Sequence, residues 1–363
     1  MKRIFFTVTN DLTYDQRMNR ICTSLAEAGY KVMLVGRTLP SSLPLKKEKY
    51  EQKRIHCWVN KGKAFYAEYN MRLFVYLLFQ KMDAICAIDL DTILPCLRIS
   101  KWKKIPRIYD AHELFSGLKE VVSRPAIKKA WTKIEKHAVP QFMYGYTVSQ
   151  SIAEEFHKRY RVNYKTIRNV SRLKEMDTAQ ASEKFIIYQG AVNEARAFEY
   201  LIPAMKWVDC KLVICGDGNF MPQLKQLIND HQLNNKIELK GMLTPDDLWK
   251  VSQQAYMGIA VAENEGLNQY YALPNKFFDY LHAGLPQVTM DYPEYQKLNK
   301  QYEVALLIDN LAPERIAAAI NNLLNDDVMY ERLRQSCLKA RLEWNWQQEE
   351  KKLLAFYQPV FNS

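Results

Sequence analysis

The stretch KFIIYQGAVNEARAFEYL, residues 184–201, decides the fold class of this chain. It opens with a short apolar run, passes through a polar loop that begins at Gly190, and continues into an amphipathic segment. The same order returns in KLVICGDGNFMPQLKQLI, residues 211–228. Short apolar runs that alternate with helices are typical of βαβ units, which build parallel sheets. We therefore expect a doubly wound α/β domain in the C-terminal half.

The first half of the chain shows the same alternation. RIFFTVT (3–9) and KVMLVG (31–36) are predicted strands, separated by a helix that ends before Gly29. A polar stretch, residues 167–185, interrupts the pattern between the halves. The predicted fold class is therefore α/β, with two doubly wound Rossmann-like domains facing a cleft, where ligands of such sheets bind by default.

Composition indicates a folded globular protein, because 48% of the 363 residues are hydrophobic and 25% are charged. No run of about 18 apolar residues is present, so no transmembrane helix is expected. The N-terminal apolar run is too short for a secretory signal. Seven cysteines without a C-x-x-C pair indicate reduced thiols and no zinc site. We expect a cytoplasmic location.

The net charge of +11 favours anionic partners. Basic segments lie in the first half, at 45–54, 60–63 and 101–107, with aromatic residues interleaved over 64–81. No RNP motif or zinc-finger spacing accompanies them, so nucleic acid is not an expected partner. Two interpretations stay open. One is a solvated basic face over a core helix; the other is peripheral attachment through 45–81 and 101–107 to the anionic inner face of the cell membrane.

Two loops after predicted strands in the second half carry features of phosphate binding. In the first, Gly190 allows close backbone approach and Arg196 adds a positive charge before a helix. In the second, Gly216, Asp217 and Gly218 form a tight turn into a helix. Neither loop has the G-x-G-x-x-G spacing of a dinucleotide fingerprint, which counts against a nicotinamide-dependent dehydrogenase.

The third loop, residues 262–284, follows another predicted strand and is rich in polar groups. Pro274 fits the first turn of a helix, and Gly284 fits the position just past its end. Lys276 and Asp279 are three residues apart and share a face near the positive end of the helix dipole. They form either a surface ion pair or an anion site beside a polar anchor, and the polar side chains that surround them favour the second. Those side chains are Glu263, Glu265, Asn268 and Asn275.

Taken in order, these loops resemble the nucleotide-binding half of GT-B glycosyltransferases. The segment LPNKFFDYLHAGLP (273–286) narrows the resemblance to the retaining glycosyltransferases of group 1, or family four. In the first half, NDLTYDQRMNR (10–20) and IYDAHELF (108–115) add to it. The resemblance implies transfer of a sugar from a nucleotide diphosphate sugar to a glycan or lipid-linked acceptor, with retention at the anomeric carbon, in the synthesis of a cell-surface polysaccharide or glycoconjugate.

The resemblance also implies a domain plan. Residues 1–170 would bind the acceptor, residues 171–343 would bind the nucleotide sugar, and residues 344–363 would form a helix that packs back on the N-terminal domain. A UDP- or GDP-sugar is the expected donor, with no cofactor. No metal is expected, because fixed cations can neutralise the leaving diphosphate and no D-x-D motif lies in a suitable loop.

Site residues follow from the same resemblance, position by position. Arg196 and Lys276 would bind the diphosphate and Asp279 the ribose, while His112 would hydrogen-bond the donor sugar or assist proton movement. The loops around the nucleotide would include Gly190, Gly216, Asp217, Asn268 and Asn275. The acceptor side would include Asn10, Asp11, Asp110 and Glu113.

Two departures from the family pattern leave alternatives open. The family's E-x7-E motif has Tyr271 in place of its first acid and the shorter Asp279 as its second, so Glu263 and Glu265 are candidates for the missing catalytic carboxylate, with Glu263 taken as the catalytic residue. Ala191 occupies a position where many members have arginine. A non-catalytic GT-B protein that binds nucleotide or acts as a scaffold is therefore one alternative. A non-hydrolysing nucleotide-sugar epimerase is another, against which the basic aromatic stretch 45–81 argues.

Overall fold

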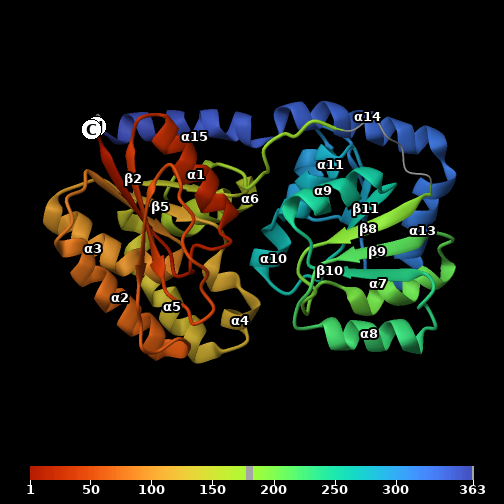
Figure 1. The fold of residues 1–363 in the computed structure, drawn as a ribbon, viewed down its shortest axis with the longest axis horizontal. Coiled ribbons are helices and arrows are strands. Elements are labelled where there is room, and N and C mark those ends of the chain that lie inside the picture. Colours follow the sequence, from red (N-terminus) through yellow and green to blue (C-terminus); the bar gives the residue numbers. More distant parts are fainter. Residues whose placement is uncertain (177–182, 362–363) are drawn as a thin grey trace. The chain divides into compact units, whose positions relative to one another are not determined.

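The computed structural model describes residues 1–176 and 183–361, which form two compact α/β units (Figure 1). Unit 1 contains Met1–Asn169, Gly266–Asn268 and the C-terminal segment from Gln348. Unit 2 contains Val170–Glu265 and Gln269–Gln347. Of the polar stretch predicted between the domains, residues 177–182 lie outside the described part of the chain.

Unit 1 is built on a seven-stranded parallel sheet in the order β3-β2-β1-β4-β5-β6-β7. The central strands β1 and β4 are buried along almost their whole length, as a sheet covered on both faces requires. The strands are β1 (Arg3–Thr7), β2 (Lys31–Arg37), β3 (Glu51–Ile55), β4 (Ala84–Ile88), β5 (Arg107–Ala111), β6 (Tyr144–Thr147) and β7 (Lys165–Thr166).

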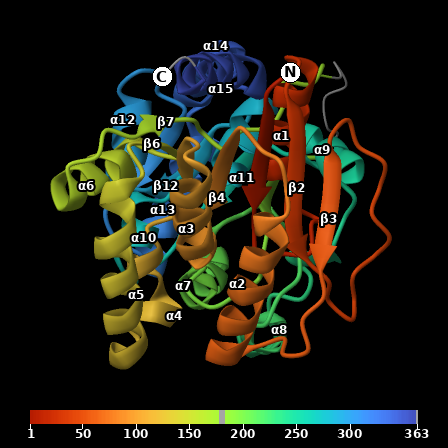
Figure 2. The ribbon, with the colours of Figure 1, turned by 90° about the vertical axis from the view of Figure 1, so that its left-hand side faces the viewer.

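Helices cover both faces of this sheet. On one face α2 packs against α3 and α3 against α5 (Figure 2). On the other, Tyr357 of the C-terminal helix α15 packs on Phe6 of β1 and Tyr146 of β6. The helices of this part of the chain are α1 (Gln16–Glu27), α2 (Gly62–Leu78), α3 (Ile93–Lys103), α4 (Lys119–Val122), α5 (Pro125–Ala138), α6 (Gln150–Tyr160) and α15 (Trp346–Val360), with 3₁₀ turns η1 (Leu90–Thr92), η2 (Phe115–Gly117) and η3 (Val139–Gln141).

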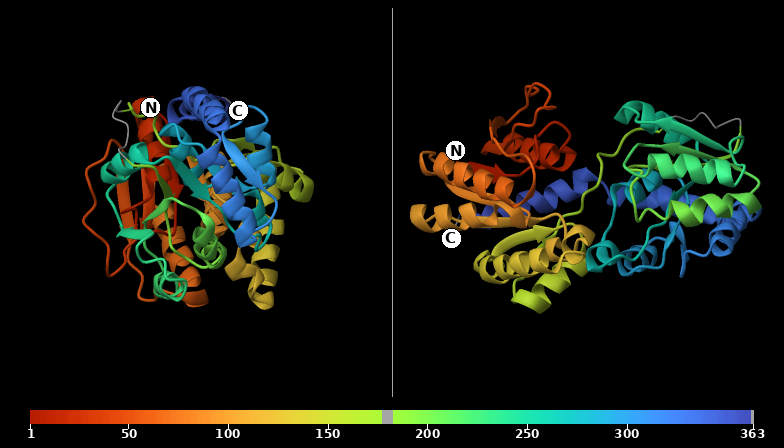
Figure 3. Two further views of the ribbon diagram at one scale, coloured as in Figure 1. Left: turned by 90° about the vertical axis from the view of Figure 1, so that its right-hand side faces the viewer. Right: turned by 90° about the horizontal axis from the view of Figure 1, so that it is seen from below.

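Unit 2 has a six-stranded parallel sheet in the order β10-β9-β8-β11-β12-β13. Its strands are β8 (Phe185–Gln189), β9 (Lys211–Cys215), β10 (Ile237–Gly241), β11 (Met257–Ala260), β12 (Gln287–Met290) and β13 (Ala305–Ile308). Helices lie on both faces of the sheet (Figure 3). They are α7 (Phe198–Ala204), α8 (Met221–Asp230), α9 (Pro245–Gln254), α10 (Leu267–Tyr271), α11 (Asn275–His282), α12 (Pro293–Asn299), α13 (Pro313–Asn325) and α14 (Asp327–Glu343), with the 3₁₀ turn η4 (Met205–Trp207).

Helix α11 is placed by its ends and by its buried face. Pro274 is its N-cap residue, one position earlier than the predicted first turn, and Gly284 follows its end with φ +71°. Tyr280 anchors the helix to the sheet, because its hydroxyl accepts a hydrogen bond from Gln189 N and donates to Ile259 O. The polar face of α11 is thereby held at the ends of β8 and β11.

The predicted fold class of two doubly wound α/β domains is confirmed. The sequence did not predict strand β3, which begins inside the basic run 45–54. This strand lies at the edge of the unit 1 sheet, where polar side chains can face water. No described helix is long and apolar enough to cross a membrane.

Candidate active site

The strand order of unit 2 reverses between β8 and β11. In doubly wound sheets ligands bind at such a switch point, beyond the carboxyl ends of the strands. The loops that follow β8 and β11 meet there, since Glu263 N donates a hydrogen bond to Ala195 O. Two of the three predicted loops therefore lie at one edge of one sheet.

Glycines allow the first two loops to pack backbone against backbone. Gly190 N donates to Cys215 O, and Val192 N donates to Asp217 O. Gly216 has φ +155°, and a Cβ at this position would lie 1.9 Å from Gly190 O. The glycines that sequence reasoning assigned to ligand approach thus also join the loops to each other.

Lys276 projects from the first turn of α11 toward the Gly190 loop. Its ammonium lies 3.6 Å from the centre of the Tyr188 ring. A Cβ on Gly190 would lie 3.6 Å from Lys276 Cε and 3.7 Å from Nζ. Burial, together with the guanidinium of Arg196, lowers the pKa of Lys276 well below its ordinary value. The site therefore holds two half-buried cations that repel each other.

Both cations line a cavity of about 30 Å³ at the carboxyl edge of β11. Among the described residues, neither Arg196 nor Lys276 forms an ion pair with a carboxylate. Ala260, Val261 and Ala262 form one wall, and aromatic side chains close another. Two unneutralised cations beside backbone-rich glycine loops form an arrangement suited to an anion.

Asp279 lies one turn along α11 from Lys276 and does not pair with it. Its carboxylate accepts hydrogen bonds from Ser171 Oγ at 2.7 Å and from Gln189 Nε2 at 2.8 Å. Gln189 is held in turn by Ser252 Oγ at 3.2 Å. The interpretation of Lys276 and Asp279 as a surface ion pair is wrong, and Asp279 is a fixed acceptor beside the two cations.

The remaining predicted donor-side residues are less uniform. Asp217 is exposed, and its carboxylate accepts a hydrogen bond from Gly218 N. Glu263 is half-buried near Tyr292, and burial together with this carboxylate raises the pKa of the Tyr292 hydroxyl. Asn275 is exposed at the start of α11. Asn268 is grouped with unit 1, where its Oδ1 accepts a hydrogen bond from Leu114 N at 2.9 Å.

In unit 1 the predicted His112 belongs to a buried charge cluster at the ends of β4 and β5. Its Nε2 lies 3.1 Å from Asp110 and its Nδ1 lies 3.7 Å from Asp89. Although burial favours the neutral ring, these two carboxylates raise the pKa of His112 to about 9. Asp110 also pairs with the buried Arg17 at 3.0 Å. The two carboxylates therefore favour the protonated, hydrogen-bond-donating form of His112, while burial raises the pKa of Asp89 well above its ordinary value.

The predicted acceptor-side residues after β1 make local contacts. Asn10 is exposed and donates to Asp15, which caps helix α1 through Met18 N. Asp11 accepts hydrogen bonds from Thr13 N, Thr13 Oγ1 and Ser42 Oγ. Glu113 is half-buried next to His112 in the chain. These contacts shape the loops and do not test a role in binding an acceptor.

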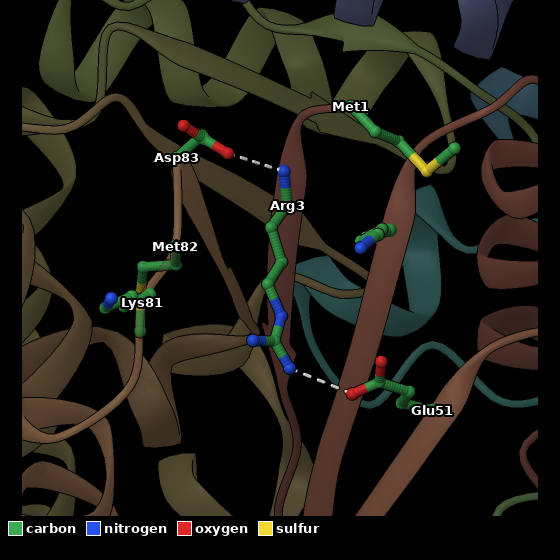
Figure 4. Close-up of a pocket in the computed structure, with 7 residues that line it drawn as sticks. Met1, Arg3, Glu51, Lys81, Met82 and Asp83 are labelled. Carbon is green, nitrogen blue, oxygen red and sulfur yellow. Dashed lines mark hydrogen bonds and ion pairs between the residues drawn. The ribbon is translucent and has the colours of Figure 1, made fainter.

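A larger cavity, of about 350 Å³, lies at the opposite edge of the unit 1 sheet. Arg3 lines this cavity, where its backbone N–H donates a hydrogen bond to Asp83 and its guanidinium donates one to Glu51 (Figure 4). It is formed at the amino ends of the strands, where parallel sheets do not bind their ligands by default. Among the described residues no group of three or more His, Cys, Asp or Glu side chains could hold a metal ion.

The sequence of unit 2 matches a known protein family. Residues 171–340 match the family described as Glycosyl transferases group 1. This region, a little under half of the chain, is therefore a glycosyltransferase group 1 domain. It is also 24% identical over 144 residues to chitobiosyldiphosphodolichol beta-mannosyltransferase of Candida albicans. That alignment covers 38% of this chain and 31% of the relative, so the chain spans about a third of the length of the curated relative it matches.

Several solved structures share the fold over the whole length of this chain. Sucrose-phosphate synthase from Thermosynechococcus elongatus superposes with a TM-score of 0.83 at 15% identity, covering 100% of both chains. HepE of Anabaena in complex with UDP and glucose superposes with a TM-score of 0.74 at 12% identity, and the match covers 99% of this chain and 100% of that chain. At these identities the likeness shows the GT-B fold and nothing finer.

Sequence reasoning missed the residues that hold the candidate side chains in place. Tyr188 and Gln189 end β8 immediately before Gly190, and a polar pair at the end of a buried strand is a signal that could have identified them. Asp89 directly follows the buried strand β4, and its φ of +53° is uncommon outside glycine. Ser171 carried no signal, because it lies 108 residues from Asp279 in the chain.

Proposed function

We propose that this protein is a retaining glycosyltransferase that takes a sugar from a nucleotide diphosphate sugar and transfers it to a glycan or a lipid-linked acceptor. The observation that carries the proposal is the convergence of Arg196 and Lys276 on one cavity without a carboxylate partner among the described residues. Two mutually repelling cations are costly in the empty protein, and a diphosphate would remove that cost.

The chemistry of the proposed reaction fits these groups. Negative charge develops on the leaving diphosphate, so Arg196 and Lys276 would stabilise the transition state from fixed positions. Asp279, already fixed by Gln189 and Ser171, would accept hydrogen bonds from the ribose hydroxyls. Same-face attack, with the leaving phosphate assisting deprotonation of the acceptor, would retain the anomeric configuration. The proposed step assigns no role to a metal ion.

His112 has a narrower role in this proposal than its sequence context allowed. With its pKa raised to about 9 by Asp110 and Asp89, it would donate a hydrogen bond from a charged ring rather than act as a general base. Its side chain is 23% exposed, which leaves part of the ring open to a ligand.

Two of the similar proteins support particular substrates. HepE of Anabaena was solved with UDP and with UDP-glucose, which favours a UDP-sugar as the first donor to test. The name of the Candida albicans relative describes mannosyl transfer to a diphosphate-linked dolichol glycan, which supports a lipid-linked acceptor. We therefore place the proposed reaction in the synthesis of a glycoconjugate or cell-surface polysaccharide.

Thermal unfolding in the presence of UDP, GDP, ADP and TDP, with CMP as a monophosphate control, tests the donor site. A diphosphate at 100 times its dissociation constant should stabilise the protein by about 2.7 kcal/mol. Lys276→Ala should abolish this effect. Lys225→Ala, which removes an exposed lysine from α8 in the same unit, should keep it. If no diphosphate stabilises the wild type, or both variants behave alike, the proposed site is wrong.

A second candidate function, nucleotide binding without turnover, is favoured by Tyr271. This side chain stands where the family has its first acid, and it packs against Tyr270 with ring centroids 5.4 Å apart. A scaffold of this kind would bind a nucleoside diphosphate but release no sugar from UDP-glucose, with or without acceptor lipids. Measured release of sugar and nucleotide distinguishes the two functions.

A further inference from the structure

Large apolar side chains gather on the outer side of the α2 and α3 layer in unit 1. Along α2, Met71, Val75 and Phe79 follow one another at intervals of four residues, which places them on one stripe of the helix surface. The buried residues of α2 lie on the other side. We call the exposed set the α2–α3 face; its members and their exposed fractions are Trp58 (80%), Met71 (65%), Val75 (47%), Phe79 (81%) and Trp102 (72%).

Direct contacts join these residues into one surface. The guanidinium of Arg72 stacks 4.3 Å from the centre of the Trp58 ring, so Trp58 lies against the middle of α2. At the other end, Lys103 Nζ donates to Leu78 O at 2.8 Å, which holds the end of α3 beside the end of α2. Phe79 follows Leu78 in the chain, and Trp102 directly precedes Lys103. Figure 2 shows α2 and α3 adjacent on the outside of the sheet.

Positive charge surrounds the α2–α3 face. Segments 61–81, 93–104 and 124–138, which contain α2, α3 and α5, hold thirteen lysines and arginines but only two acids. Of the acids, Glu135 is buried and Glu68 pairs with Arg72. The exposed cations therefore have almost no acidic counterpart within this layer. They include Lys81, Lys101, Lys104, Lys128, Lys129 and Lys133.

We propose that the α2–α3 face docks on an anionic lipid bilayer. Exposed tryptophan and phenylalanine side chains enter the boundary between headgroups and acyl chains, while lysines along the rim contact lipid phosphates. At about 1.5 Å per residue, the 17-residue α2 would lie along the surface for roughly 25 Å. The surface differs from the charge run 45–54, which ends in the edge strand β3 and includes no residue of α2 or α3. The proposal uses no donor-site residue and is independent of the proposed transferase activity.

Co-sedimentation with vesicles tests the proposal, using phosphatidylcholine alone and phosphatidylcholine mixed with phosphatidylglycerol. The wild type should bind only the mixed vesicles and should be released by salt. Replacing both Lys101 and Lys104 by glutamate should lower partitioning at least about thirtyfold, at roughly fivefold for each lost surface cation. The double variant Phe79→Ser/Trp102→Ser should lower it at least about tenfold, because two exposed rings no longer enter the bilayer.

Matched changes in unit 2 provide the controls. Val328→Ser/Leu342→Ser removes two exposed apolar side chains of α14, and Lys225→Glu/Lys339→Glu reverses two exposed charges. Both should bind mixed vesicles like the wild type. Quenching of tryptophan fluorescence by brominated acyl chains, reduced in Trp102→Phe, would place this ring in the bilayer. Equal binding to neutral vesicles, equal losses in the controls, or a dimer formed through this face without vesicle binding would overturn the proposal.

Discussion

The ammonium of Lys276 lies 3.6 Å from the centre of the Tyr188 ring, held there while Arg196 faces the same cavity. The aromatic face attracts the charge, whereas burial and the second cation oppose it. Because the pKa of Lys276 is lowered, the opposing effects win in the empty protein. The same buried charge that would bind an anion therefore lowers the stability of the unliganded protein.

Replacing Lys276 by methionine should stabilise the unliganded protein. Methionine keeps the length of the side chain and contacts the Tyr188 ring favourably through sulfur, without the buried charge. We expect a gain of about 1 kcal/mol in the free energy of unfolding, together with loss of stabilisation by nucleoside diphosphates. Denaturant unfolding with and without UDP measures both effects. The exposed Lys225→Met is the reference variant and should leave the unfolding free energy nearly unchanged. If unliganded Lys276→Met were less stable than the wild type, the buried charge of Lys276 would not destabilise the fold.

Alanine at position 216 should damage the fold and the candidate site together. Its Cβ would lie 1.9 Å from Gly190 O, which cannot move without disturbing the loop that faces Lys276. We expect a loss of about 3 kcal/mol in unfolding free energy from this overlap. Gly241→Ala is the matched control, since Gly241 also has a positive φ, +63°, but open space around its Cβ position. It should cost only about 1 kcal/mol, from backbone strain alone. Similar losses in both variants would show that the contact with Gly190 is not what requires glycine.

These loops also show how far sequence reasoning reaches. The alternation of apolar runs and helices predicts both parallel sheets, because each buried strand needs a continuous apolar run. Gly190 and Gly216 could be identified because each directly follows a buried run, and Lys276 because it lies in the first turn of an amphipathic helix. The partners of Asp279 could not, since Ser171 and Gln189 meet it only through the tertiary fold. Edge strand β3 was missed for a related reason: polar alternation at an edge looks like a charged surface.

Restoring the missing acid tests whether Tyr271 limits activity. Tyr271→Glu recreates the E-x7-E spacing with Asp279 as the second acid. If the chain turns over a nucleotide sugar, the added carboxylate should raise release of sugar from UDP-glucose about tenfold by stabilising developing positive charge on the sugar. Tyr270→Glu, one residue earlier in α10, is the control and should give no increase. Equal activity in wild type and Tyr271→Glu would mean that another group, such as Glu263, already supplies the carboxylate.

The stability of the protein should depend on pH through two histidines, in opposite directions. The folded-state pKa of His112 is raised from 6.5 to about 9. Its contribution is therefore fully present below pH 6.5 and is lost as the pH rises through about 9, amounting to about 3 kcal/mol. Burial lowers the pKa of His282 to about 4, so its contribution is present above pH 6.5 and is lost as the pH falls toward 4.

Denaturant midpoints measured across both pH intervals separate the two effects. His112→Gln should flatten the decline of stability between pH 6.5 and 9 and leave the acid limb unchanged. His282→Gln should flatten the acid limb alone, at the cost of the hydrogen bond that His282 Nε2 makes with Trp344 O at 2.7 Å. A His112→Gln protein that kept the alkaline decline of the wild type would mean that Asp110 and Asp89 do not hold a proton on this ring. His112 would then regain the general-base role that its protonation excludes.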